Sequence, residues 1–440
     1  MDDNTPDSPK DGPRDRPHDN PAGPRSRVRD LDIVVYGATG FVGELTAAHL
    51  AAAAPRSTRI ALAGRSRERL EATRSRLGER ARDWPLLVAD AHDTAALGGI
   101  AAAAHVVVTT VGPYARYGMP LAHACAAAGT DYTDLSGEVL FVRDSIDAHH
   151  ELARGTGARI VHACGFDSVP SDIGVHVLHE RVRADGAGEM TGTALVLTSV
   201  RGGISGGTID SLRGQIDTMR TDRARRRQVL DPYTLSPDRA AEPDFGRQSD
   251  FALLRGSAVS PALRGTLAPF VMAPFNTRVV RRSNALRGHA YGSRFRYREA
   301  MAAGRGPLSP LIAAGTAAGI GGLLAGLALP PTRRLLDRLL PAPGTGPDEE
   351  TRERGHFTAD LFTITTTGAR YTARFRAQGD PGYRATAVML GQSALALALD
   401  RDALPDSPGG VLTPATGIGD ALVARLRAAG TTVAVRPLPG

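Results

Sequence analysis

A glycine-rich turn between a predicted strand and a predicted helix constrains this chain more than any other feature. Residues 31–36 (LDIVVY) form a β-branched run typical of a strand buried on both faces, and residues 44–51 read as a helix. The turn between them has the spacing Gly37-x-x-Gly40-x-x-Gly43. The first glycine permits the tight turn, the second lets backbone N–H groups approach a pyrophosphate, and the third allows close helix–strand packing. The motif predicts a dinucleotide-binding turn; the alternative is a tight turn without a ligand.

Strands and helices keep alternating to about residue 163, and this sets the fold class. Further apolar runs predict strands at residues 59–63, 86–90, 106–111, 130–134 and 159–163. The segments between them read as helices, one of which is predicted over residues 120–128. We therefore expect an α/β chain with a Rossmann-type doubly wound parallel sheet.

After about residue 170 the candidate strands are longer and partly alternating. They lie at residues 193–200, 289–297, 357–366 and 370–377. The last two flank Thr367-Gly368-Ala369, a predicted hairpin turn, so we expect a second α+β domain built on a largely antiparallel sheet. The polar, arginine-rich stretch 221–266 gives no clear secondary-structure signal, and residues 386–399 and 419–429 read as helices.

Changes in composition divide the chain into four parts. Residues 1–29 contain one strongly apolar residue, Val28, and no apolar signal-peptide region, so we expect a disordered leader on a cytoplasmic protein. Two unpaired cysteines, Cys125 and Cys164, fit a reducing compartment. The predicted parts are the leader (1–29), a dinucleotide-binding Rossmann domain (30–168), a second α+β substrate domain (169–384) and C-terminal helices that pack back on the first domain (385–440).

Residues 310–329 contain no charge and are flanked by Arg305 and Arg333. Their length meets the threshold of about 20 residues for crossing a bilayer, but five glycines lower their hydrophobicity. Three interpretations stay open: a buried Gly/Ala-rich core helix, a lipid-facing amphipathic or re-entrant element, and a transmembrane helix. The second would give the protein a peripheral contact with the inner membrane.

The end of the second strand distinguishes NADP(H) from NAD. An NAD site places a carboxylate there for the ribose 2′-hydroxyl, whereas this chain has Arg65 and Ser66. A guanidinium can pair with a 2′-phosphate, so we expect NADP(H). Later strand ends should add further contacts. The predicted cofactor-binding residues are Gly37, Thr39, Gly40, Phe41, Val42, Gly43, Arg65, Ser66, Asp90, Ala91, Gly112, Pro113, Ser136 and Gly137.

The basic residues exclude several classes of chemistry. Lys10, in the leader, is the only lysine, which argues against Schiff-base chemistry, Walker A loops and the Tyr-x-x-x-Lys pair of short-chain dehydrogenases. Residues 201–298 hold 18 Arg against 8 Asp+Glu, an excess of +10 in a chain of net charge +7. This basic region is either a solvated face or a surface for an acidic partner, and no aromatic-rich or zinc-finger pattern points to nucleic acid. No metal-ligand motif is complete.

Together the motifs resemble those of the saccharopine dehydrogenase-like oxidoreductases, and within them the bacterial trans-acting enoyl reductases of polyketide-derived lipid synthesis. The resemblance runs from Asp32 to the C-terminus. It rests on the glycine turn and on the blocks at residues 63–66, 111–114, 132–138, 164–172, 205–208, 343–347, 380–383 and 410–414. It implies an NADPH-dependent reductase of a carbon–carbon double bond in an acyl chain carried as a thioester on a carrier protein or polyketide synthase; the oligomeric state stays open.

Enoyl reduction needs a donor for the developing enolate and a proton for the α-carbon. The candidates are Tyr114, Asp167 and Ser168, which follow predicted strand ends; packing and helix capping are their structural alternatives. Two other functions remain: a saccharopine dehydrogenase-like reductase of an amino-acid substrate, and a non-catalytic NADP-binding, lipid-associated protein.

Overall fold

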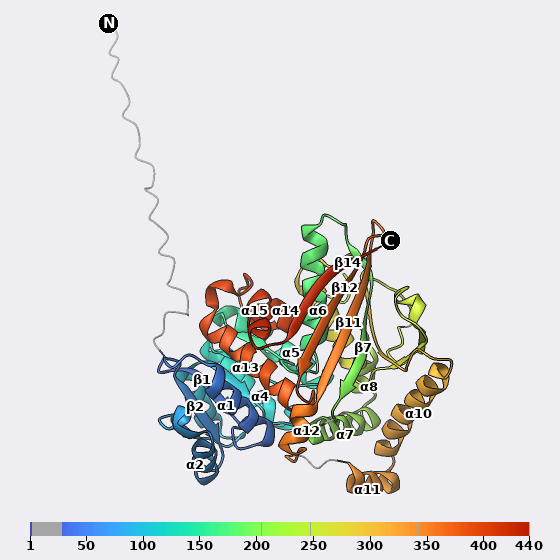
Figure 1. Ribbon diagram of the computed structural model, residues 1–440. Coiled ribbons are helices and arrows are strands. Elements are labelled where there is room, and N and C mark those ends of the chain that lie inside the picture. The colour runs from blue at the N-terminus through green and yellow to red at the C-terminus, as the bar shows by residue number, and fades with distance from the viewer. Residues whose placement is uncertain (2–28, 204, 247, 341–343, 440) are drawn as a thin grey trace.

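The computed structural model describes residues 1, 29–203, 205–246, 248–340 and 344–439 (Figure 1). Nearly all of the predicted leader therefore lies outside the described residues. The described chain forms two seven-stranded sheets with helices packed between and around them. The helices are α1 (Phe41–Ala53), α2 (Arg67–Arg76), α3 (Thr94–Ala103), α4 (Tyr114–Ala128), α5 (Val139–Thr156), α6 (Val169–Ala184), α7 (Gly206–Thr221), α8 (Arg223–Leu230), α9 (Ala273–Leu286), α10 (Ser309–Ala328), α11 (Pro330–Leu339), α12 (Glu349–Arg354), α13 (Arg384–Leu399), α14 (Pro414–Gly417) and α15 (Asp420–Ala428).

The first sheet is parallel throughout, as the strand–helix alternation predicts. Its strand order is β13-β6-β5-β4-β1-β2-β3, with β1 (Leu31–Tyr36), β2 (Ile60–Gly64), β3 (Leu86–Val88), β4 (Ala104–Thr109), β5 (Asp131–Thr133), β6 (Arg159–Val161) and β13 (Gly410–Leu412). Helices cover both faces of β1, so Ile33, Val34 and Val35 are all fully buried. The edge strand β13 comes from the far end of the chain and was not predicted.

The second sheet is antiparallel except for the pair β7–β10. Its order is β14-β12-β11-β7-β10-β9-β8, with β7 (Met190–Arg201), β8 (Leu254–Arg255), β9 (Thr266–Pro269), β10 (Arg296–Ala302), β11 (His356–Thr365), β12 (Arg370–Gln378) and β14 (Thr432–Leu438). The predicted β11–β12 hairpin is confirmed. The predicted strand at 289–297 is wrong: Gly288, His289 and Gly292 have positive φ angles there, and the strand begins at Arg296.

The C-terminal segment serves both sheets. Helix α13 packs on α1 and on strands β4 and β5 of the first sheet. After it, β13 joins the first sheet beside β6, and β14 joins the second beside β12. The region 385–440 therefore contributes two strands in addition to the helices that the sequence predicts.

Buried arginines of α9 hold the irregular segment that follows α8. Arg278 donates to the Val229 carbonyl, Arg281 to that of Pro232, and Arg282 to those of Leu235 and Val411. All three side chains are almost completely buried. Part of the basic excess of residues 201–298 is therefore internal and presents no charge to a partner.

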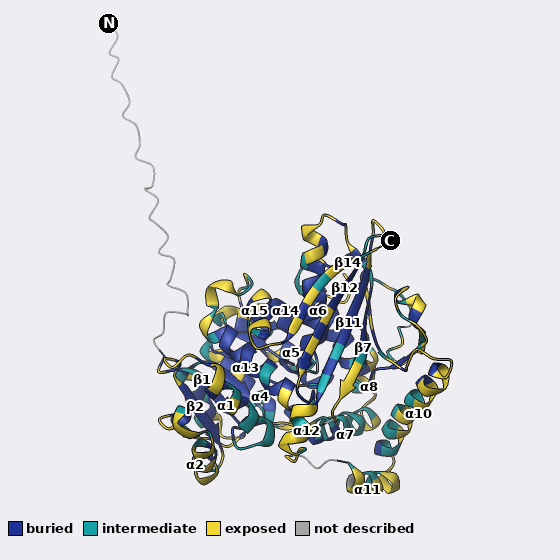
Figure 2. Ribbon diagram, in the orientation of Figure 1, coloured by how far each residue is buried: buried dark blue, intermediate teal, exposed yellow. Residues whose placement is uncertain are grey.

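Helix α10 corrects one interpretation of residues 310–329. Its only buried residues are Ser309, Ala313 and Leu327, so it is not a core helix. Figure 2 shows α10 at the edge of the molecule, with much of its length exposed or half-buried. Among the described residues it is the one helix long and apolar enough to cross a bilayer, and 11% of its most apolar window is buried.

Candidate functional site

The glycine turn is built for close approach of the backbone. Gly37 has φ +87°, and a Cβ on it would lie 2.6 Å from Cγ2 of Val111. A Cβ on Gly43 would lie 2.0 Å from the Gly37 carbonyl oxygen, so α1 packs directly on the turn. Gly40 occupies the N-cap of α1 without a side-chain cap, which leaves first-turn N–H groups for a ligand.

A large cavity of about 1650 Å³ runs from this turn along the carboxyl edge of the first sheet and into the second. Its first section is the cofactor crevice. Most of the predicted cofactor residues line it: Gly37, Thr39, Gly40, Phe41, Val42, Arg65, Asp90, Ala91, Gly112, Pro113 and Gly137. Gly43 lies behind the turn and acts through packing.

The adenosine end of the crevice carries two arginines. Arg65 is exposed at the end of β2 and makes no hydrogen bond or ion pair within the described chain. Arg69, which sequence reasoning missed, lines the same wall one helical turn later and donates to the Thr39 carbonyl at 2.9 Å. Ser66 does not line the crevice: it caps α2 by accepting from Arg69 N, which corrects its predicted role.

Asp90 also remains at the crevice. Its side chain accepts from His92 N at 3.0 Å, whereas Asp93, the neighbouring acid, caps α3. Helix capping therefore does not account for Asp90. These residues fit NADP(H): a glycine turn in which a Cβ would clash, helix N–H groups for the pyrophosphate, and an unpaired guanidinium for the 2′-phosphate.

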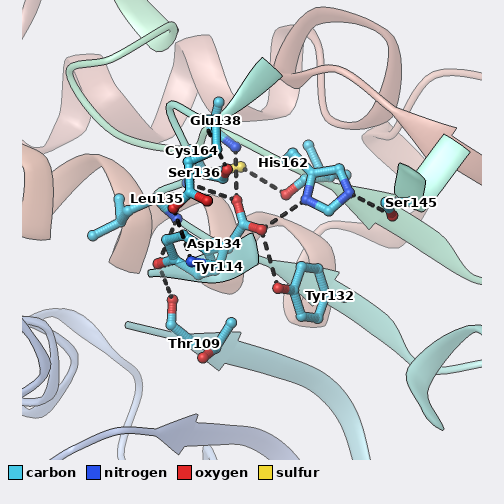
Figure 3. A network of polar contacts seen from close by, with 12 residues as sticks. Thr109, Tyr114, Tyr132, Asp134, Leu135, Ser136, Glu138, Ser145, His162 and Cys164 are labelled. Carbon is cyan, nitrogen blue, oxygen red and sulfur yellow. Dashed lines mark hydrogen bonds and ion pairs between the residues drawn. The ribbon is translucent and has the colours of Figure 1, made fainter. Parts of the chain in front are cut away.

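At the nicotinamide end, Tyr114 has a structural role. Its hydroxyl donates to the Thr109 carbonyl at 3.2 Å and accepts from Leu135 N at 3.1 Å, and the side chain is buried (Figure 3). Helix α4 begins at Tyr114, six residues earlier than predicted. The cause is remote, because the Glu138 carboxylate accepts from both Tyr114 N and Ala115 N at 2.8 Å. Tyr114 therefore has no free hydroxyl for a substrate, contrary to our expectation.

Two predicted serines also lie away from the cavity. Ser136 is fully buried, and its hydroxyl accepts from Glu138 N at 3.2 Å. Ser168 is fully buried and donates to Oδ1 of Asn276 at 3.0 Å. Neither residue lines the cavity. Both predictions came from placing them after strand ends, and the backbone turns each of them inward.

Asp167 lies at the cavity wall beside Gly137. Burial and, second, the negative charge of Asp134 raise the pKa of Asp167 to about 7. Asp167 can therefore hold a proton near neutral pH, next to the place where the nicotinamide ring is expected.

Asp134 lies in a buried network of hydrogen bonds (Figure 3). Asp134 accepts from Tyr132 OH at 3.0 Å, from the backbone of Ser136 and Ala163, and pairs with His162 Nδ1 at 2.7 Å. His162 Nε2 meets Ser145 Oγ at 2.8 Å. This Asp–His–Ser order resembles a hydrolase triad, but none of the three lines the cavity and all are buried, so the network is structural.

Cys164 belongs to the same interior. Its thiol is fully buried, and burial raises its pKa well above the ordinary value. It therefore stays protonated, which argues against an acylated nucleophile. Among the residues that the structure describes, no three His, Cys, Asp or Glu side chains form a group that could hold a metal ion.

The second section of the cavity is an apolar chamber next to the nicotinamide end. Its walls come from α7, the end of α8, α9, α10 and strands of the second sheet. The apolar residues lining it include Leu212, Ile216, Met219, Val229, Leu230, Phe251, Phe270, Val271, Met272, Met301, Ile320, Leu323 and Leu324. Sequence reasoning missed all of them, because a chamber between remote segments has no local signal.

Comparisons with known proteins agree with this geometry. Residues 33–161 match the model of the saccharopine dehydrogenase NADP binding domain. The chain is 56% identical over 412 residues to a Mycobacterium tuberculosis protein provisionally named a trans-acting enoyl reductase, covering 92% of this chain and 97% of that protein. It is 52% identical over 421 residues to the trans-acting enoyl reductase of Mycobacterium ulcerans, covering 94% and 99%.

A solved structure supports the fold as a whole. Apo saccharopine dehydrogenase (L-Glu forming) from Saccharomyces cerevisiae aligns with a TM-score of 0.50 at 13% identity, over 93% of this chain and all of that one. At this identity the likeness concerns the fold alone. The first sheet and its glycine turn thus form an NADP-binding domain, joined to a second sheet in the same overall arrangement.

Proposed function

Because this chain belongs to the trans-acting enoyl reductase family and carries an NADP-binding domain, we propose that it reduces a carbon–carbon double bond in a thioester-bound polyketide or fatty acyl chain. This reduction would be a step of lipid biosynthesis, and the acyl chain would be bound to a carrier protein or a polyketide synthase.

The continuity of the cofactor crevice with the apolar chamber carries the proposal. Both belong to one cavity of about 1650 Å³, above the roughly 300–1,000 Å³ of an ordinary ligand site. Such a cavity suits a dinucleotide and an acyl chain together. Binding in the chamber would be driven by the burial of apolar surface, and a hydrocarbon chain offers such a surface.

The reduction divides between cofactor and protein. Bound NADPH supplies the hydride to the β-carbon. We assign the proton to Asp167: its carboxyl holds a proton at the cavity wall and transfers it to the α-carbon, which leaves a saturated thioester and a carboxylate that solvent reprotonates. Three hydroxyl groups that line the cavity already donate within the protein. The acceptor of Tyr114 is the Thr109 carbonyl, that of Ser211 is the Glu138 carboxylate, and that of Tyr383 is the Thr345 carbonyl.

The test is turnover by the purified protein. We expect NADPH oxidation with α,β-unsaturated acyl thioesters, with kcat/KM rising with chain length as the chain fills the chamber. Replacing Ile320, on the α10 wall, by Trp should lower kcat/KM for long chains and leave short chains unchanged. Binding of NADPH without turnover on any enoyl thioester would contradict the proposal.

The chamber also bears on the other candidate functions. A dicarboxylic amino-acid substrate needs cationic side chains to pair with its carboxylates. Arg278, the buried arginine at this wall, is already paired with Asp250 at 2.5 Å. Turnover of saccharopine would favour that alternative. Binding of NADPH without turnover would favour a purely non-catalytic role.

We propose in addition that the protein is cytoplasmic and that α10 brings it to a membrane surface. Its inner face, including Ile320 and Leu323, lines the chamber, while Leu311 on its outer face is exposed. Ile312, one turn before the lining residue Thr316, is exposed as well. Both faces of this wall are thus apolar, and Arg334 and Arg338 of α11 lie exposed at its end.

Vesicle sedimentation tests this contact. Leu311→Asp with Ile312→Asp should abolish binding to vesicles containing anionic lipid and preserve NADPH binding. Val88→Asp, at an exposed apolar position on the first sheet's edge strand, is a control for adding a carboxylate away from α10. Equal sedimentation of all three proteins would contradict a membrane role for α10.

A further inference from the structure

Helix α8 carries three unpaired arginines on one face. Arg223, Arg226 and Arg227 are exposed at i, i+3 and i+4, and none makes a side-chain hydrogen bond or ion pair within the described chain. The helix contains no acidic residue. Unlike the buried arginines of α9, these three present their charge to solvent.

The opposite face holds α8 in place. Arg225 points the other way and pairs with Asp144 of α5 at 2.5 Å. At the C-terminal end, Val229 is buried and its carbonyl accepts from Arg278 at 3.2 Å. The three exposed arginines therefore lie on a fixed platform.

This platform borders an opening of the apolar chamber. Leu230 lies on the same face as the three arginines, one turn after Arg226 and Arg227, and both it and Phe251 line the cavity. They are nevertheless 59% and 42% exposed. The chamber wall thus reaches solvent at the end of α8, beside the arginines.

We propose that Arg223, Arg226 and Arg227 form the docking surface for an acidic carrier domain that inserts its thioester-bound acyl chain into the chamber past Leu230 and Phe251. The inference rests on the proposed function and names its partner surface. The charge selects an acidic domain and attracts it before contact, and the adjacent apolar opening selects one that bears an acyl group. A carrier domain bound at these arginines would hold its acyl chain directly at the opening between Leu230 and Phe251.

The experiment compares two substrates of the same enoyl group. One is carried on an acidic carrier domain, and the other is an uncharged N-acetylcysteamine thioester. In the triple variant Arg223→Glu, Arg226→Glu, Arg227→Glu, kcat/KM for the carrier-bound substrate should fall about tenfold or more, and that for the small thioester should change less than about twofold. Raising the salt concentration should reduce the wild type's preference for the carrier-bound form.

A matched control separates local charge from net charge. The triple variant Arg56→Glu, Arg255→Glu, Arg264→Glu changes net charge equally, at exposed arginines that neither line the cavity nor form ion pairs within the described chain. It should keep wild-type kinetics on both substrates. Since the α8 reversal could unfold the helix, the neutral triple Arg→Gln variant, checked by thermal melting and NADPH binding, should show a smaller loss in the same direction.

Each outcome decides something. If the wild type reduces neither substrate, the proposed function fails. If it reduces both and the α8 variant loses nothing on the carrier-bound form, or the control variant loses as much, the docking surface alone is wrong. If the α8 variant instead loses sedimentation with anionic vesicles and keeps its carrier kinetics, these arginines bind lipid headgroups.

Discussion

At the residue scale, we expect Arg65 to select between the two nicotinamide cofactors. It is the one arginine at the adenosine end that sequence reasoning identified, and it is unpaired within the described chain. Pairing of this guanidinium with a 2′-phosphate would account for NADP(H) binding at a site that has no carboxylate at the end of β2.

We expect Arg65→Ala to weaken NADPH binding by about 1.5–3 kcal/mol and NADH binding far less, because only NADPH offers the phosphate partner. Titration of both cofactors by fluorescence measures the difference. Arg56→Ala, at an exposed arginine of the opposite sheet edge, is the control. Equal weakening of both cofactors by Arg65→Ala would show that it does not contact the 2′-phosphate.

If Asp167 supplies the proton, as proposed, activity should depend on pH. Because the pKa of Asp167 is raised to about 7, the acid form needed for protonation is present below that pH and lost above it. We expect kcat to fall as pH rises through about 7, and Asp167→Asn to lower kcat strongly at every pH and remove this limb. A pH–rate profile of both proteins measures this; an unchanged limb in the variant would assign it to another group.

The raised pKa of Asp167 also makes the stability of the protein fall as the pH rises. A folded-state pKa above the unfolded value means that the buried carboxyl favours folding at low pH and loses that contribution as pH rises through about 7. Asp167→Asn should therefore raise the melting temperature at alkaline pH relative to wild type, even as it lowers turnover.

At the element scale, the contact between α1 and the glycine turn holds the crevice together. A methyl group on Gly43 would lie 2.0 Å from the Gly37 carbonyl oxygen, so backbone must move. We expect Gly43→Ala to cost about 1–3 kcal/mol of unfolding free energy and to weaken NADPH binding. Gly99→Ala is the matched control. It lies within α3, where a Cβ meets nothing within 4 Å, and should stabilise by about 0.5–1 kcal/mol. Urea denaturation compares them; equal effects would contradict the packing argument.

Elements were predictable where their signal is local. The β1 run and its glycines specify both strand and turn within thirteen residues, and the β11–β12 hairpin follows from alternation around Gly368. The start of α4 was not predictable, because its cap is Glu138, twenty-four residues away. Strand β13 has three residues and exists only as an addition to β6, so no periodicity could reveal it.

The candidate site divides in the same way. The crevice residues were found because strand ends of a parallel sheet meet at one edge. Tyr114, Ser136 and Ser168 were misassigned because the sequence does not show which way a side chain turns after a strand. The chamber and the α8 arginines depend on segments that come together only in the folded chain.

At the scale of the whole molecule, the two sheets share one hydrophobic core. A single cluster of buried side chains includes Ile33 of β1, Leu361 of β11 and Val433 of β14. Helix α6, which follows β6 of the first sheet, packs on β7, β11, β12 and β14 of the second sheet and is buried along most of its length. The parts are therefore coupled rather than independent.

We expect the chain to unfold in one cooperative transition. Trp84, the only tryptophan, belongs to the shared cluster on the side of the first sheet, while far-ultraviolet circular dichroism reports on both sheets. The two signals should give the same urea midpoint, and NADPH should raise both equally. Separate midpoints would show that the sheets unfold independently.

The placement of β13 and β14 has a consequence for biosynthesis. Because β13 and β14 complete one sheet each, a chain emerging from the ribosome can finish neither sheet until residues 410–438 have been translated. Until then, the nascent polypeptide would expose the unpaired edges of β6 and β12. A chaperone that shields those edges should therefore raise the yield of functional enzyme more than slower translation does.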